Sequence, residues 1–147
     1  MPRRFRVWCT DPHWIEVLRS RSLHDNVNFW RGDQRRVRLP PGSHFYFWRR
    51  GTRHIVGRAV FRTQAAMSIS EAWKTFGYGN GVLSCEELRR QAVDVLHLAS
   101  DTLACLVLDE VRFLDEPYPP LPLTFKATNN PKDYREGSLP DIESRFT

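Results

Sequence analysis

Residues 26–62 constrain the fold of this chain more than any other stretch, because aromatic residues and arginines alternate there after a polar Asn-Val-Asn start. The run at 44–48 is almost entirely aromatic, and aromatic residues are enriched in β-strands. A strand over 54–62 would put Ile55, Gly57, Ala59 and Phe61 on one face and both arginines on the other, which is the period of a second strand. The turn-forming residues between the two runs predict a β-hairpin. A segment this rich in rings and positive charge is also suited to hold a nucleic-acid backbone and stack a base.

The positive charge of the chain is concentrated in its first part. Residues 1–62 carry 14 arginines and four acidic residues, a net charge of +10, whereas residues 63–147 have a net charge of −5. Nearly all the cationic side chains are arginines, which favour bidentate contacts with phosphates or base edges over diffuse attraction. The asymmetry indicates an anionic partner, and the alternative is a basic surface that is merely solvated.

Length and cysteine usage bound the class of protein. A chain of 147 residues is most simply one domain with a core of its own. The three cysteines are widely separated and form no Cys-x-x-Cys pair, which is typical of reduced thiols in a cytosolic protein. No apolar run approaches the roughly 20 residues that span a bilayer, so we expect a cytoplasmic protein with no membrane partner.

Motifs for metal binding and catalysis are missing from the sequence. The five histidines and three cysteines lack the spacing of metal ligands, so no metal or other cofactor is expected. There is no phosphate-binding glycine loop and no nucleophile elbow, and the acidic pairs are adjacent in sequence, so that on regular structure they point apart. We therefore expect a binding module without catalytic residues.

The first 33 residues predict a strand, a helix and a loop. Alternation at 5–9 is the period of a half-buried strand, whose outer face would display Trp8. Asp11 followed by Pro12 is a good helix start, with the aspartate as N-cap. Residues 22–33 lose all periodicity and are expected to form a loop or irregular edge.

Two further helices and a core strand follow the hairpin. A helix is predicted to open at Ser68 and to stop at the glycine-rich residues 77–81. Ser84 and Glu87 have the spacing of a capping box for a third short helix. Residues 103–108 are nearly all apolar and predict a core strand. Five or six strands with three short helices predict an α+β fold, built on a small, strongly bent sheet or pseudo-barrel flanked by the helices.

Four segments taken together carry a family resemblance: VNFW at 27–30, LPPGSHFYFW at 39–48, IVGRAVF at 55–61 and ISEAWKTFGYGNG at 69–81. They resemble the EVE branch of the PUA-like superfamily, which is related to YTH and ASCH domains. The N-terminal domains of HNH-nuclease-linked, modification-dependent restriction proteins are especially similar. The resemblance covers residues 5–125, so we expect one EVE/PUA-like domain over 1–125 and a polar tail or linker over 126–147.

What the resemblance implies is a module that flips a modified base into an aromatic pocket. A modified cytosine in DNA is favoured over a modified adenine in RNA, with an HNH-type nuclease attached or as a partner. Carried over position by position, the pocket falls on Trp8, Asp11, Asn28, Phe29, Trp30, Phe47 and Trp48. Trp30 and Trp48 are the expected sandwich around the base, and Asn28 and Asp11 the expected contacts to its edge.

Each of these residues also has an interpretation in which it only supports the fold. The rings can belong to the core, Asn28 can satisfy backbone groups of its loop, and Asp11 can serve as an N-cap alone. Trp8 stands where the nuclease-linked relatives often have a small residue, which would narrow the pocket or add a wall. Seven arginines of the same stretch are expected to neutralise flanking phosphates, with steep salt dependence: Arg31, Arg35, Arg36, Arg49, Arg50, Arg53 and Arg58.

Two other functions stay open. Some ASCH domains are small amidohydrolases that act on modified nucleosides with a lysine, a threonine and an acid, for which Thr10, Lys74 and Glu71 are the candidates here. Lys74 follows a helix start and does not lie on the aromatic strands, which argues against this function. The third function is a module whose aromatic surface docks RNA or a protein. The salt dependence of binding distinguishes nucleic-acid binding from protein docking, because phosphate binding weakens steeply with salt whereas an apolar protein interface does not.

Overall fold

A computed structural model of the chain describes residues 4–32, 35–95, 97–98, 100–122, 133–135, 139 and 141–146. One curved sheet contains the six strands β1 (Arg4–Thr10), β2 (Val27–Arg31), β3 (His44–Arg49), β4 (Ile55–Ser68), β5 (Thr102–Phe113) and β6 (Asp133–Arg135). Three α-helices accompany it: α1 (Pro12–Ser20), α2 (Ile69–Phe76) and α3 (Cys85–Arg90). Short helical turns complete the described structure at Gly77–Asn80, Gln91–Val95 and Glu143–Phe146.

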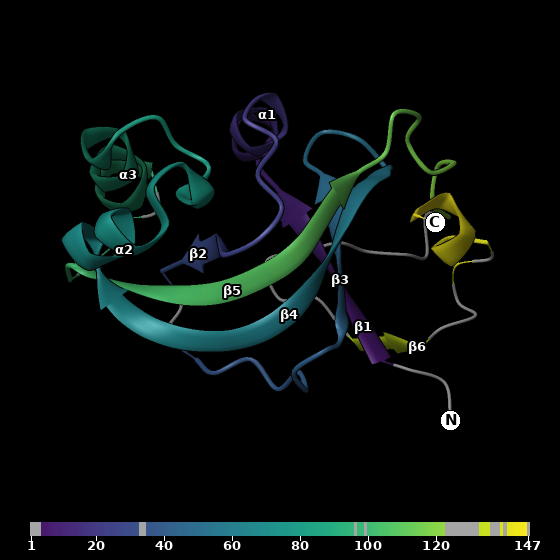
Figure 1. The fold of residues 1–147 in the computed structure, drawn as a ribbon, viewed down its shortest axis with the longest axis horizontal. Helices are drawn as coiled ribbons and strands as arrows, with labels where there is room; N and C mark the ends of the chain where they lie inside the picture. The colour runs from purple at the N-terminus through teal and green to yellow at the C-terminus, as the bar shows by residue number, and fades with distance from the viewer. Residues whose placement is uncertain are drawn as a thin grey trace.

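The strand order is β2-β5-β4-β3-β1-β6, so β2 and β6 are edges and the sheet does not close. β1 and β3 are parallel, and the other neighbours are antiparallel. Figure 1 shows β4 and β5 bent into a bowl, with α1 above its concave side and α2 and α3 at one end. Register shifts in β4 accompany the bend, as expected where bulges increase local twist. The expected α+β fold with a strongly bent sheet and short flanking helices is confirmed.

The aromatic run of β3 is buried on both faces of the sheet. Phe45 and Phe47 pack with Trp8 in the inner core, which is the apolar cluster between the sheet and α1. Tyr46 and Trp48 point the opposite way into the outer core, the cluster formed with Leu114 and other residues of the later chain. Because both faces are covered, the strand has no polar side, and its sequence is continuously aromatic.

Local capping residues begin the helices where the sequence predicts. The Asp11 carboxylate accepts a hydrogen bond from the backbone N–H of His13 at 2.9 Å, at the start of α1. The Ser68 and Ser84 hydroxyls accept equivalent bonds at α2 and α3. Glu87 accepts from the backbone N–H of Leu83, one residue before the cap, at 3.1 Å. These three helix starts are confirmed.

Of the two alternatives expected for residues 22–33, the loop is wrong for β2, which forms an edge of the sheet. This edge strand pairs with β5, with Val27 opposite Leu108 and Arg31 opposite Ala104. Its Asn and Asp neighbours suggested a turn, but β5 supplies a complete row of backbone partners, and Val27 and Phe29 are buried in the inner core. Tertiary pairing therefore overrides the local composition.

The end of the chain buries more than a polar tail would. β6 pairs with β1, and Leu139, Ile142 and Phe146 are each about 5% exposed or less, in the outer core. Isolated apolar residues at irregular spacing give no periodicity, so the sequence did not reveal these contacts among residues 126–147, which were expected to form a polar tail or linker. Residues 126–132 lie outside the described residues. We call Leu139 and residues 141–146 the C-terminal segment.

We expect Gly81→Ala to destabilise the protein far more than Gly51→Ala. Both glycines have positive φ, at 69° and 85°, so the backbone strain of an alanine, about 1–2 kcal/mol, is common to both. A Cβ at Gly81 would overlap the indole of Trp14, whereas nothing lies within 4 Å of a Cβ at Gly51. Urea denaturation should show a loss of about 3 kcal/mol or more for Gly81→Ala. Equal losses in the two variants would contradict this packing of Trp14.

Candidate functional site

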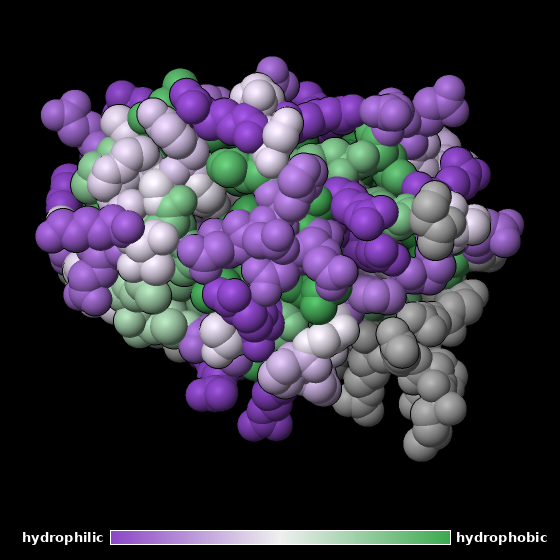
Figure 2. All heavy atoms as spheres, viewed as in Figure 1, coloured by the Kyte–Doolittle hydropathy of each residue, from purple (hydrophilic) through white to green (hydrophobic). Residues whose placement is uncertain are grey.

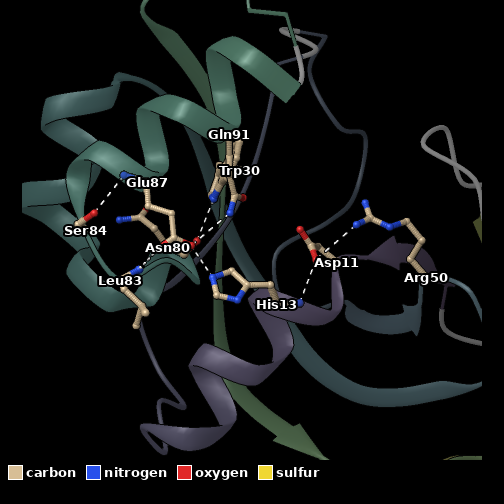
Figure 3. A network of polar contacts seen from close by, with 9 residues as sticks. All are labelled: Asp11, His13, Trp30, Arg50, Asn80, Leu83, Ser84, Glu87 and Gln91. Atoms are coloured by element: carbon tan, nitrogen blue, oxygen red, sulfur yellow. Dashed lines mark hydrogen bonds and ion pairs between the residues drawn. The ribbon is translucent and has the colours of Figure 1, made fainter.

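Polar side chains gather where β1 and β3 end and α1 begins. Thr10 and Arg49 are register partners, and the backbone N–H of Arg50 donates to the carbonyl of Thr10 at 2.9 Å. Asp11 caps α1 and also lies 3.4 Å from the guanidinium of Arg50, whose side chain is 63% exposed. The capping carboxylate thus anchors an exposed arginine beside a helix N-terminus, as Figure 3 shows.

A histidine–carboxylate pair joins α1 to α3 in the same region. The Nε2 atom of His13 contacts Oε1 of Glu87. The Glu87 carboxylate is further fixed by the backbone N–H of Leu83 at 3.1 Å and by the amide of Gln91 at 3.3 Å. Its side chain is 13% exposed and that of His13 is 42% exposed. The carboxylate therefore orients an imidazole at the surface, whose second ring nitrogen remains as a polar group.

Behind this pair, two buried asparagines connect β2 to the turn after α2. The amide nitrogen of Asn80 donates to the carbonyls of Ala72 and Gly77 at 3.0 and 2.9 Å, so its oxygen is left to accept from Asn28 at 2.9 Å. The two carbonyls thereby determine the amide orientation of both asparagines. The carbonyl of Asn80 accepts from the indole N–H of Trp30 at 2.9 Å, which holds that ring in place.

Asn28 is entirely buried and does not present its edge to solvent. Its amide donates to Asn80 and, at 3.3 Å, to the sulfur of Cys105. Its side-chain oxygen makes no hydrogen bond among the described residues. Burial raises the pKa of the Cys105 thiol, which keeps it neutral. The Asn28 amide therefore supports the fold through side chains of other elements, and not through backbone groups of its own loop.

The predicted pocket residues are not brought together as one aromatic cage. Trp8, Phe29 and Phe47 lie in the inner core, and Trp48 lies in the outer core. Trp30 is only partly buried and packs against a third cluster, beneath α2 and α3. The expected sandwich of Trp30 and Trp48 is not formed in this structure, because the two rings lie against different clusters.

The Trp8 ring is buried inside the protein and is not exposed on its surface. It is 4% exposed, and its ring stacks on Phe45 with centroids 5.4 Å apart at an angle of 14°. The guanidinium of Arg31 lies 5.1 Å from the same ring. The half-buried strand predicted for β1 is in fact covered on both faces, which corrects the expectation that Trp8 faces outward.

The predicted phosphate-binding arginines divide into two groups. Arg35, Arg36, Arg49 and Arg50 are exposed. The second group is partly buried and comprises Arg31, Arg53 and Arg58. In this group Arg53 donates hydrogen bonds to the carbonyls of Leu121 and Pro122, and Arg58 forms an ion pair with Glu143. Figure 2 shows hydrophilic side chains over much of the face in view, between smaller apolar areas.

The threonine, lysine and acid proposed for an amidohydrolase do not meet. Thr10 is 1% exposed, and its hydroxyl donates to the carbonyl of Trp8 at 2.8 Å. Lys74 and Glu71 are exposed on α2. No hydrogen bond or ion pair joins them to Thr10 in the part of the chain that the structure describes. His13 and Glu87 are the acid–base pair that the sequence did not reveal, because they lie 74 positions apart.

Two features are absent from the part of the chain that the structure describes. No three metal-ligating side chains gather in one place there. No helix in the described ranges is both long and apolar enough to cross a membrane.

Among the solved structures that share this fold are ASCH domains, which belong to the PUA-like superfamily. An ASCH protein from Zymomonas mobilis aligns over 95% of this chain and 94% of its own, with a TM-score of 0.64 and 14% identity. Its tyrosine-to-phenylalanine variant gives 0.61 and 15% over 95% and 96%. Its serine-to-alanine variant gives 0.60 and 17% over 98% of each chain. The chain matches no protein-family profile and no curated protein by sequence. Identities this low show the fold alone.

We expect Asn28 and Asn80 to be energetically coupled. Asn80→Ala leaves two carbonyls and the Asn28 amide without their partner, at a cost of about 2–3 kcal/mol. In a double-mutant cycle measured by urea denaturation, Asn28→Ala should cost about 1 kcal/mol less in the Asn80→Ala background than in the wild type. Additive losses would mean that the two amides stabilise the fold independently.

Proposed function

We propose that this protein is a nucleic-acid-binding module that reads a modified base, a modified cytosine in DNA, as the specificity module of a restriction or modification system with an HNH-type nuclease. The observation that carries the proposal is the site at the ends of β1 and β3. There the exposed Arg49 and Arg50 adjoin the N-terminus of α1 and the oriented His13. The PUA-like fold of the structural neighbours is consistent with it.

The exposed arginines supply the sequence-independent part of binding. Arg49 and Arg50 follow one another at the end of a rigid strand, and Arg35 and Arg36 lie in the segment before it. Guanidinium groups pair with phosphates through two parallel hydrogen bonds. Each phosphate neutralised releases counterions, so affinity should fall steeply as salt rises.

Trp30 is the aromatic residue of the predicted pocket that keeps partial exposure. Stacking on its ring is worth about 1–3 kcal/mol, comparable to the few kcal/mol needed to extrude a base. His13 and Asp11 are the nearby groups that can contact a base edge. A buried methyl group adds about 0.8 kcal/mol, which corresponds to about a fourfold preference for the methylated base. A fourfold preference is small, so the proposed reader would take most of its affinity from the arginine contacts to phosphates.

A second candidate function is hydrolysis of a modified nucleoside, with which the ASCH fold of the structural neighbours is consistent. The observation that favours it is the His13–Glu87 pair, since a carboxylate-oriented imidazole is a common general base. Loss of an amidohydrolase activity in His13→Ala, with binding retained, would select this function over the reader.

Trp30→Ala should remove the preference for modified DNA, while an Arg49→Ala/Arg50→Ala variant should weaken binding to all duplexes alike. Fluorescence anisotropy with duplexes carrying plain, methylated and hydroxymethylated cytosine tests both. The slope of log K against log salt should fall by about 2 for the double variant, about 0.9 for each lost phosphate contact.

Matched controls are available on the helices. Trp73→Ala removes another partly buried indole packed on the same cluster as Trp30, and Arg89→Ala removes an exposed arginine of α3. Both should leave binding unchanged. Equal affinity of the wild type for modified and plain duplexes would refute the reader, and stronger binding to single-stranded RNA would identify an RNA-binding module.

A further inference from the structure

Two donors and a neighbouring histidine from the β3–β4 hairpin surround the carboxylate of Glu143. The hydroxyl of Tyr46 donates to Oε1, and Nη1 of Arg58 pairs with Oε2. The Nδ1 atom of His44 lies 3.0 Å from Oε1. Tyr46 and Arg58 are direct cross-strand partners, and His44 is two residues along β3 on the same face. The sheet therefore fixes all three groups relative to one another.

These donors lie deeper than the carboxylate that they bind. The side chains of His44 and Arg58 are 14% and 15% exposed, whereas that of Glu143 is 41% exposed. Burial, and then the hydrogen bond to Glu143, raise the pKa of Tyr46, so its hydroxyl remains a donor at neutral pH. An anion arriving from solution would approach from the side where Glu143 now lies.

Glu143 does not use every donor of the site. The Nε atom of Arg58 is buried and makes no hydrogen bond with any described residue. A carboxylate offers two oxygens, whereas a phosphate group offers at least one more acceptor. The unused N–H is therefore better matched by a phosphate than by the present occupant.

The C-terminal segment is held to the sheet by contacts that do not involve this carboxylate. The Arg58 guanidinium lies 4.8 Å from the ring of Phe146, and Arg112 donates to the carbonyl of Phe146 at 3.2 Å. Leu139 and Ile142 are buried in the outer core. Removing the Glu143 carboxylate should thus vacate the donors without releasing the segment.

We propose that Tyr46, Arg58 and His44 form a phosphate-binding site, which the protein's own Glu143 occupies in place of the phosphate. The site itself does not depend on nucleic-acid binding. Only the assignment of its phosphate to a nucleic-acid backbone rests on the proposed function. In that case the C-terminal segment competes with the nucleic acid for Arg58.

Titration of the full chain with inorganic phosphate, followed by NMR of the β3 and β4 amides, tests the proposal. Glu143→Ala should bind phosphate about tenfold more tightly than the wild type, because the Tyr46 and Arg58 donors lose their internal acceptor. Asp141→Asn is the matched control, since it removes one negative charge from the same segment and asparagine tolerates the positive φ of 59° there. Arg58→Gln in the Glu143→Ala background should abolish the gain.

Phosphate binding by Glu143→Ala that is no tighter than that of Asp141→Asn would overturn the proposal and leave Glu143 as a structural clasp. If Glu143→Ala does not fold, Glu143→Gln applies the same criterion with a side chain of equal size. A short single-stranded oligonucleotide forms the second arm. A gain for both probes identifies backbone phosphate, and a gain for inorganic phosphate alone identifies the free anion. A wild type that binds no nucleic acid refutes the proposed function but not this site.

Discussion

Burial of the β3 aromatic residues on both faces of the sheet is the constraint on which the rest of the structure depends. Phe45 and Phe47 pack under α1 with Trp8, while Tyr46 and Trp48 need a cover on the opposite face. The C-terminal segment and the residues after β5 supply that cover. Aromatic side chains bury more apolar area than any others, so these two cores contribute a large part of the folding free energy. The arginines that follow the aromatic run of β3 therefore become exposed at the end of that strand.

The position of each arginine along its strand explains why some arginines are exposed and others are partly buried. Arg49 and Arg50 leave β3 where its aromatic run stops, and they stay exposed beside the N-terminus of α1. Arg58 lies mid-strand on the outer face, where the C-terminal segment meets it. A single arginine-rich stretch therefore produces two distinct arrangements of arginine, one exposed to solvent and one paired with a partly exposed carboxylate of the C-terminal segment. The charge count alone does not distinguish them.

Local signals in the sequence predict much of the fold, and long-range pairing explains the rest. The caps Asp11, Ser68 and Ser84 act within one turn, so their sequence signatures suffice. β2 exists because β5 pairs with it, and no signal within its own residues reveals this. The pocket prediction grouped Trp30 with Trp48, which lie against different apolar clusters. The sequence could not show that Trp48 points to the other side of the sheet, because that depends on which residues later in the chain cover each face.

The measurement that tests the central claim most directly is an NMR titration of the wild-type protein with a duplex containing methylated cytosine, observed at the tryptophan indoles. Trp30 is partly exposed, and its N–H donates to the carbonyl of Asn80, whereas Trp14 is buried and its N–H donates to the carbonyl of Asn28. We predict that the Trp30 indole and the amides of Arg49 and Arg50 shift, while the Trp14 indole does not. Shifts confined to other surfaces, or no shifts at all, would contradict nucleic-acid binding at this site.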